Sequence, residues 1–176
     1  MKKSLFLLSF LIITSFSFSQ DDDKKGFDAS KVRVDGNVGV NIDNSILNIS
    51  FLPLISHEIL PKWSLGFGPN VTYVQNLSTS NSSLSYGGNI FTRYSILPEL
   101  YLQAESEWLN FESGFNPDGI ATRTWTNSIL LGAGYNKSLG NGLNASLTFL
   151  YIVNYDPATS PYNNPVIVRG GINKSF

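Results

Sequence analysis

The sequence predicts an all-β fold, an eight-stranded up-and-down antiparallel barrel that closes on itself. Apolar and polar residues alternate with a period of two in eight segments, which is the pattern of strands with two different faces. No convincing helical period of three to four appears after residue 30. Nearly all connections are hairpin-sized, so consecutive strands are expected to pair. The predicted strands cover residues 32–42, 47–55, 63–73, 84–95, 100–110, 125–135, 143–155 and 166–176.

In the first four segments, the apolar positions are filled by valine, isoleucine, leucine and aromatic residues. Valine occupies positions 32, 34, 38 and 40, with glycine at 36, and Leu47, Ile49 and Phe51 open the next segment. The third segment alternates aromatic or aliphatic residues with Ser, Gly, Asn and Thr. In the fourth, Ile90 and Tyr94 lie opposite the side that carries Arg93. Each segment therefore has one apolar and one polar face.

The last four segments repeat this arrangement. In 100–110, Leu102 and Trp108 alternate with polar residues, and 125–135 continues the pattern to Tyr135. The alternation is clearest in 143–155, where Leu147 and Phe149 share the apolar face. The final segment keeps the same period, so the chain ends on the apolar face. The predicted turns are 43–44, 56–61, 96–99 and 136–142, and the predicted loops are 76–83, 111–123 and 156–165.

Strand length and loop asymmetry favour a membrane barrel. The predicted strands run about 10 to 13 residues, whereas strands of soluble sheets usually have about five or six. A tilted strand that crosses a bilayer needs about this length. The connections after the second, fourth and sixth strands are compact, and those after the third, fifth and seventh are longer and more polar. Outer-membrane barrels have this asymmetry, although the turn at 43–44 departs from it.

The charges within the strands lie on the polar faces, except for Lys174 near the end of the last strand. Those on the polar faces are three positive and three negative residues: Arg33, Asp35, Arg93, Glu105, Glu107 and Arg169. A barrel of eight strands is just wide enough to be filled by side chains, so we expect this balanced set to neutralise itself in the interior. Glu105 and Glu107 point to the same side of their strand. Paired carboxylates could act as acid and base, but buried charges need partners, which favours pairing with the arginines.

Aromatic residues cluster near strand ends on the apolar face, as expected of the two interfacial girdles of a membrane barrel. They are Trp63, Tyr73, Tyr94, Trp108, Trp125, Tyr135, Tyr155 and Phe176. A soluble barrel would bury this face and expose the polar one, and the period alone cannot distinguish the two. In lipid, an open sheet edge is not tolerated, so the eighth strand is expected to pair with the first.

The first residues resemble a secretory signal peptide. Lys2 and Lys3 precede an apolar run from Leu5 to Ile13, and small residues follow. We expect residues 1–19 to be the signal, residues 20–30 a disordered polar leader and residues 31–176 the barrel domain. The alternative is a membrane-spanning helix, for which the run is too short. The chain has no cysteine, which excludes acylation on cysteine and a disulfide scaffold.

Together, the signal-like start, the eight amphipathic strands and the ending Arg169–Phe176 resemble the small bacterial outer-membrane β-barrel family. The segment Phe91-Thr92-Arg93-Tyr94 also looks like a strand end of such proteins. The resemblance implies a transmembrane barrel in a Gram-negative outer membrane, with outer-membrane lipid as its surroundings. It also implies insertion by the barrel-assembly machinery, which recognises a final strand that ends in an aromatic residue, here Phe176.

The sequence offers little catalytic chemistry. His57 is the only histidine, it falls in the predicted turn 56–61, and no base-orienting partner is apparent, so we expect no enzyme activity. One histidine without cysteine cannot form the usual transition-metal set, so we expect no metal site. A formal net charge of −1 gives no basic face for nucleic acid. No phosphate-binding glycine motif or nucleophile elbow occurs, so we expect no cofactor.

Four functions remain open at this point. The leading hypothesis is an integral outer-membrane barrel with a structural or surface-interaction role, in which the loops carry any binding, because binding residues concentrate in loops on rigid scaffolds. A narrow porin-like channel for small solutes is the second, suggested by small polar residues on the inward face. A secreted lipocalin-like carrier of an apolar ligand is the third. The fourth, a barrel enzyme that acts on lipid, lacks a credible site.

Overall fold

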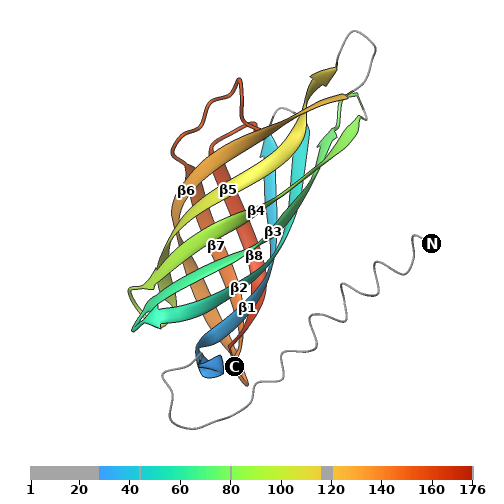
Figure 1. Cartoon of the computed structure of the whole chain (residues 1–176). Helices are drawn as coiled ribbons and strands as arrows, with labels where there is room; N and C mark the ends of the chain where they lie inside the picture. The colour runs from blue at the N-terminus through green and yellow to red at the C-terminus, as the bar shows by residue number, and fades with distance from the viewer. Residues whose placement is uncertain (1–27, 44, 80, 116–120, 176) are drawn as a thin grey trace, which may run out of the picture.

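Eight strands close into a single barrel in the computed structural model, which describes residues 28–43, 45–79, 81–115 and 121–175 (Figure 1). A short 3-10 turn, η1 (Ala29–Lys31), precedes the barrel. The strands are β1 (Val32–Asp43), β2 (Ile46–Leu60), β3 (Trp63–Asn76), β4 (Ser82–Ser95), β5 (Leu100–Phe115), β6 (Ala121–Gly140), β7 (Leu143–Ile152) and β8 (Val166–Ser175).

All pairings are antiparallel and follow chain order, and β8 returns to β1. The closing ladder runs from Arg33↔Ser175 to Val40↔Val168. The predicted fold, an eight-stranded up-and-down closed barrel, is therefore confirmed. Within the described residues, no helix is long and apolar enough to cross a membrane. The predicted signal peptide, most of the leader and Phe176 lie outside the described residues.

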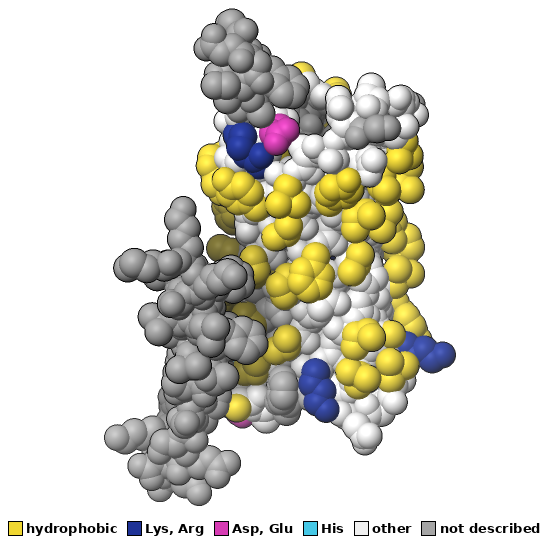
Figure 2. All heavy atoms as spheres, turned by 90° about the vertical axis from the view of Figure 1, so that its right-hand side faces the viewer, with side chains coloured by type: hydrophobic (Ala, Val, Ile, Leu, Met, Phe, Trp, Pro, Cys, Tyr) yellow, Lys and Arg dark blue, Asp and Glu magenta, His cyan; other side chains and the backbone are white. Residues whose placement is uncertain are grey.

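The period of two sorts the side chains between two environments. In β3, every second residue from Gly66 to Thr72 is buried inside, and the residues between them are exposed. The polar faces of the strands point inward, and aliphatic and aromatic residues cover the outer wall. Figure 2 shows this wall, on which hydrophobic side chains spread widely while the charged ones in view gather toward the two ends.

Several strands extend beyond their predicted ends. The predicted turn 56–61 is wrong: residues 56–60 belong to β2, and the turn is Pro61–Lys62. The turn 136–142 is likewise too long, because β6 continues to Gly140. The loop 111–123 is shorter than predicted, since β5 continues to Phe115 and β6 starts at Ala121. These extensions lack a clear alternation of apolar and polar residues, but the ladder of backbone hydrogen bonds continues through them.

The barrel is uneven at the end that carries the longer loops, here called the outer end. β7 and β8 have 10 residues each, whereas β6 has 20. β7 was predicted to reach residue 155 but ends at Ile152. The β5–β6 hairpin consequently rises above its neighbours at this end (Figure 1). The short β7 and β8 leave a notch between β6 and β1, and the loop from residue 153 to 165 spans its base, with hydrogen bonds to Ile129 on one side and to Asn41 on the other.

The exposed aromatic side chains follow the predicted girdles with two exceptions. Trp63, Tyr94 and Tyr135 lie near the short-turn end, as predicted. Trp108 lies near the middle of β5, because that strand is longer than predicted. Tyr155 lies in the loop after β7, where it packs against a buried apolar cluster and is not on the outer wall.

Glycine makes room for bulky side chains inside this narrow barrel. A Cβ atom at Gly134 on β6 would overlap the ring of Tyr101, which is buried inside and hydrogen-bonded through its hydroxyl to Thr148 Oγ1 at 2.6 Å. A Cβ atom at Gly170 on β8 would meet nothing within 4 Å. The interior therefore has no room for a larger side chain at Gly134, whereas the outer face of β8 has room for one at Gly170.

We predict that Gly134→Ala destabilises the folded barrel by about 1–3 kcal/mol, because the added methyl displaces Tyr101 in a packed interior. Gly170→Ala is the matched control and should leave the free energy of unfolding nearly unchanged. Urea unfolding in lipid vesicles, followed by tryptophan fluorescence, measures both. Equal stability of the two variants would contradict this packing.

Candidate functional site

The six predicted strand charges lie inside the barrel. Near the short-turn end, the buried carboxylate of Asp35 accepts hydrogen bonds from two arginines. Arg93 Nη1 lies 3.1 Å from both carboxylate oxygens of Asp35, and Arg33 Nη2 lies 3.1 Å from Oδ1. The guanidinium of Arg93 also lies 4.6 Å from the ring centre of Phe91, in a cation–π contact.

A second group occupies the middle of the barrel. Arg169 Nη1 donates to both oxygens of Glu105, at 2.8 and 2.7 Å, and Nη2 donates to Glu107 Oε2 at 3.1 Å. Gln103 links the two groups, because its amide oxygen accepts from Arg93 Nε at 2.7 Å and its amide nitrogen donates to Glu105 at 2.8 Å. Asn89 completes the shell of Glu105 with a hydrogen bond of 2.8 Å.

The chain of hydrogen bonds ends at the outer mouth with Tyr162. Its hydroxyl donates to Glu107 Oε1 at 2.7 Å, and its side chain is only 3% exposed. Burial raises the pKa of Tyr162 well above its ordinary value, and the carboxylate of Glu107 raises it further. The phenol therefore stays protonated and donates a hydrogen bond to a carboxylate, the stronger class of such bonds. From Arg33 to Tyr162, one connected polar chain runs along the lumen.

The loop that carries Tyr162 closes the outer mouth. Tyr162 belongs to an apolar cluster inside the mouth, together with Leu109, Leu130, Leu150, Ile152 and Ile167. Asn154 fixes one end of the loop to β6, because its side chain accepts from the Ile129 N–H and donates to the Asn127 carbonyl. Asn164 fixes the other end, since it accepts from Asn41 Nδ2 at 2.8 Å. The predicted loop 156–165 is therefore partly a plug, with Tyr162 turned inward.

The structure thus brings the six predicted charges into two linked groups. Asp35 pairs with Arg33 and Arg93, while Glu105 and Glu107 share Arg169. The sequence reasoning left Tyr162 unassigned, because a loop residue carries no period to reveal its direction. It also left out Gln103 and Asn89, although both lie on the polar faces that the alternation identified.

Every charged group of this interior set has a partner of opposite sign. The lumen is crossed by side chains at the level of Arg93 and again at Arg169. His57 lies on β2, not in a turn, and is paired in register with Val32 on the outer face of the barrel. Among the described residues, no group of three or more His, Cys, Asp or Glu residues could hold a metal ion.

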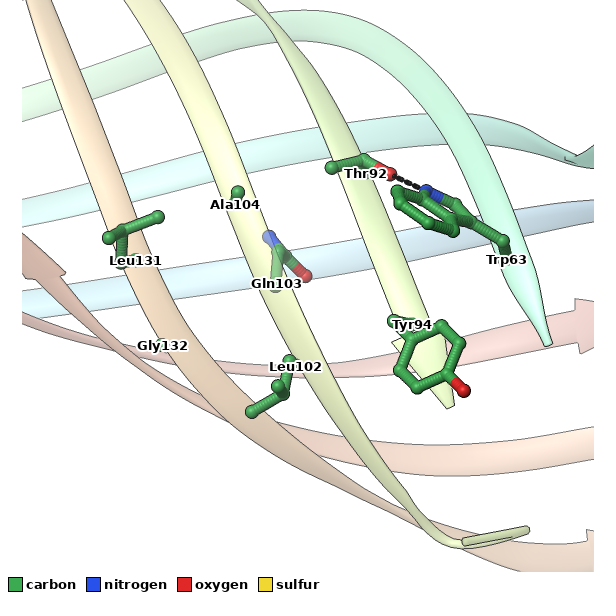
Figure 3. Close-up of a pocket in the computed structure, with 8 residues that line it drawn as sticks. All are labelled: Trp63, Thr92, Tyr94, Leu102, Gln103, Ala104, Leu131 and Gly132. Carbon is green, nitrogen blue, oxygen red and sulfur yellow. Dashed lines mark hydrogen bonds between the residues drawn. The ribbon is translucent and has the colours of Figure 1, made fainter. Parts of the chain in front are cut away.

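A shallow groove of about 340 Å³ lies on the outer wall near the short-turn end (Figure 3). Small residues on three adjacent strands form its floor, and Trp63 and Tyr94 form one side, with ring centres 5.9 Å apart. Trp63 Nε1 donates to Thr92 Oγ1, which holds the indole in place. The lining residues are Trp63, Thr92, Tyr94, Leu102, Gln103, Ala104, Leu131 and Gly132. Without a charged lining residue, the groove offers chiefly apolar contact.

We predict that Arg169→Met destabilises the barrel by about 3–5 kcal/mol, because it leaves two buried carboxylates without their cation. The triple variant Arg169→Met, Glu105→Gln, Glu107→Gln removes the charges together and should recover part of that loss. Lys137→Met, at an exposed position, is the control and should change stability by less than about 0.5 kcal/mol. Urea titration in vesicles measures all three. A single variant as stable as the control would contradict the pairing.

No protein-family model matches the chain, and no curated protein matches it. Among solved structures, it resembles the N-terminal β-barrel domain of Pseudomonas aeruginosa OprF, with a TM-score of 0.52 and 12% identity over 82% of this chain and 96% of that one. It also resembles the de novo designed TMB2.3, solved by NMR in solution, with a TM-score of 0.46 and 16% identity over 83% and 94% of the two chains. A third match comes from work on the de novo design of transmembrane β-barrels, with a TM-score of 0.41 and 20% identity over 84% and 97%. At this level of identity, the likeness to the OprF domain is a likeness of fold.

Proposed function

We propose that this chain is an integral outer-membrane β-barrel protein with a structural or surface-interaction role, whose outer end carries any binding. The observation that carries the proposal is the distribution of its two faces. The lumen holds a neutral set of paired charges, while large apolar side chains cover the wall. A soluble monomer rarely exposes a contiguous apolar patch larger than a few hundred Å². Lipid is the solvent in which such a wall is stable.

Backbone closure supports the same proposal. Inside a bilayer, each strand N–H and C=O needs a partner, and the closed order from β1 to β8 supplies one along the wall. The open groove beside Trp63 suits the acyl chain of a membrane lipid, because its lining is almost wholly apolar. In the proposed membrane orientation, the end of the barrel with the short turns faces the periplasm, and the β5–β6 hairpin lies on the outer side.

The alternatives fit the observed interior less well. A lipocalin-like carrier needs an apolar lumen, but here the lumen holds Asp35, Arg93, Glu105 and Arg169. A narrow channel needs a continuous path, whereas arginine–carboxylate pairs and the inward Tyr162 occupy the lumen. Catalysis is not part of the proposal either, because the interior carboxylates are engaged with arginines and His57 lies away from them.

The proposal includes the maturation steps implied by the sequence. Residues 1–19 would direct export, and the barrel-assembly machinery would insert the chain with Phe176 as the end of its recognition strand. Both segments carry the residue pattern that these steps require: an apolar run after two lysines, and an aromatic residue at the end of an alternating strand.

Fractionation of cells that express the full chain tests the proposal. We expect the protein in the outer-membrane fraction after carbonate washing, with a gel mobility that changes on heating, because a closed barrel resists detergent until it is boiled. Phe176→Ala should lower the amount of heat-modifiable barrel, and Ser175→Ala serves as its control. Recovery of the wild-type chain in the soluble periplasmic fraction would overturn the membrane assignment. Equal amounts of folded barrel in the two variants would remove the role of Phe176.

A further inference from the structure

The β5–β6 hairpin leaves one strand edge open beyond the barrel. β6 pairs with β5 out to Phe115↔Ala121, but its pairing with β7 begins only at Leu130↔Ile152. The residues of β6 from 121 to 129 therefore have a strand on one side only. The Ile129 carbonyl accepts from the Val153 N–H at 2.9 Å, and Ile129 N–H donates to Asn154 Oδ1 at 2.8 Å. Asn154 also reaches the Asn127 carbonyl at 2.9 Å.

Beyond Asn127, no backbone group on this side of β6 has a partner among the described residues. Alternate residues of a strand present their N–H and C=O groups to the same side. Ile129 faces β7, so Asn127, Trp125 and Arg123 face that side too. Trp125 is 60% exposed, and Thr122 and Thr124 are also exposed. The segment is rich in threonine and contains no proline, so it has a high preference for strand pairing.

The opposite edge of the hairpin is capped at its base by a side chain. The Arg123 side chain crosses to β4 and β5, where Nη2 donates to the Leu84 carbonyl at 2.7 Å and to the Asn110 carbonyl at 3.0 Å. Nη1 also pairs with Glu112 at 3.2 Å, and the guanidinium lies over the ring of Tyr86. Strand edges in natural proteins are usually covered or blunted in such ways, because an open edge is a template for another strand.

We propose that the open edge of β6, from Arg123 to Asn127, binds an extended segment of another polypeptide, which adds to the barrel as a further strand. This inference rests on the proposed function only in placing the edge at the outer interface of the membrane. The unused groups are alternating backbone donors and acceptors, and an extended polypeptide is the ligand that matches them. Specificity would come from side chains beside Trp125.

Two other occupants fit less well. The described chain begins at the short-turn end of the barrel, opposite this edge, so its own N-terminal residues would have to cross the membrane to reach it. A second copy would have to pair the same edge with itself. Antiparallel pairing of two identical edges needs a two-fold axis perpendicular to the sheet, which turns one barrel upside down relative to the other. Two copies in one membrane cannot adopt that arrangement.

The probe is a capped heptapeptide of alternating threonine and valine, added at millimolar concentration to the folded full-length protein in detergent micelles. NMR reports hydrogen exchange of the backbone amides. We expect the Trp125 amide to exchange rapidly in the free protein and at least about tenfold more slowly with peptide, because it gains a hydrogen bond. A control peptide carries N-methyl groups on every second amide, on the side that would pair with β6. It cannot donate hydrogen bonds to that edge, so it should not slow the exchange of the Trp125 amide.

Two variants separate backbone pairing from contact with the side chain. Trp125→Pro removes the N–H on the open edge, where proline is tolerated, and Trp125→Thr removes the same indole but keeps the N–H. Heat-modifiable mobility checks that both are folded. We expect the proline variant to bind the peptide at least about tenfold more weakly than the threonine variant. Equal binding by the two, or protection of Trp125 amide in the free wild-type protein, would overturn the proposal.

Self-association gives a further decisive outcome. In micelles, two copies can adopt the inverted arrangement. If the purified protein dimerises through this edge and does not bind the peptide, the occupant is a second copy, and the proposal of a separate partner is overturned. This experiment does not depend on the location of the protein. A chain that fails to fractionate with membranes would overturn the proposed function but would leave the peptide-binding result intact.

Discussion

Arg169, held between Glu105 and Glu107, is the interaction on which the rest of this barrel depends. Moving a guanidinium and two carboxylates out of water costs several kcal/mol per ion unless each one is paired and hydrogen-bonded. Here the pairing is nearly complete, with contacts of 2.7 to 3.1 Å and added donors from Asn89, Gln103 and Tyr162. Polar groups that satisfy each other fill much of the lumen, and most apolar strand residues point outward, apart from two buried clusters around Leu109 and Phe91. The apolar character of the outer wall thus follows from the polar filling of the lumen.

The same need for partners shapes the outer end. β7 and β8 stop early, and side chains bond to the backbone at the two margins of the notch: Asn154 to Ile129 and Asn127 on β6, and Asn164 to the Ile42 carbonyl on β1. Tyr162 enters the mouth and ties the loop to Glu107. Arg123 performs the corresponding role between β4 and β5. Where these side chains no longer reach, beyond Asn127, the β6 edge is left available for a partner strand.

The fold was predictable because alternation survives wherever one strand face is apolar and the other polar. The interior charges were predictable for the same reason, since Arg93, Glu105 and Arg169 all lie on polar faces. The strand ends were not, because residues 111–115 and 121–124 pair as strands without a clear alternation of apolar and polar residues. Tyr162 was missed because its direction depends on a loop fold fixed by Asn154 and Asn164, which are distant contacts that no local pattern encodes.

Site-directed spin labelling of β7 in lipid vesicles tests most directly whether the apolar wall faces lipid. The chain has no cysteine, so each introduced cysteine gives a single label. Our account predicts that collisions with dissolved oxygen, which concentrates in lipid, peak at Ala145, Leu147, Phe149 and Tyr151 and fall at Ser146, Thr148 and Leu150. A water-soluble nickel reagent should reach neither set in the middle of the strand. Access of the nickel reagent to Leu147 and Phe149, or loss of the two-residue period, would contradict the account.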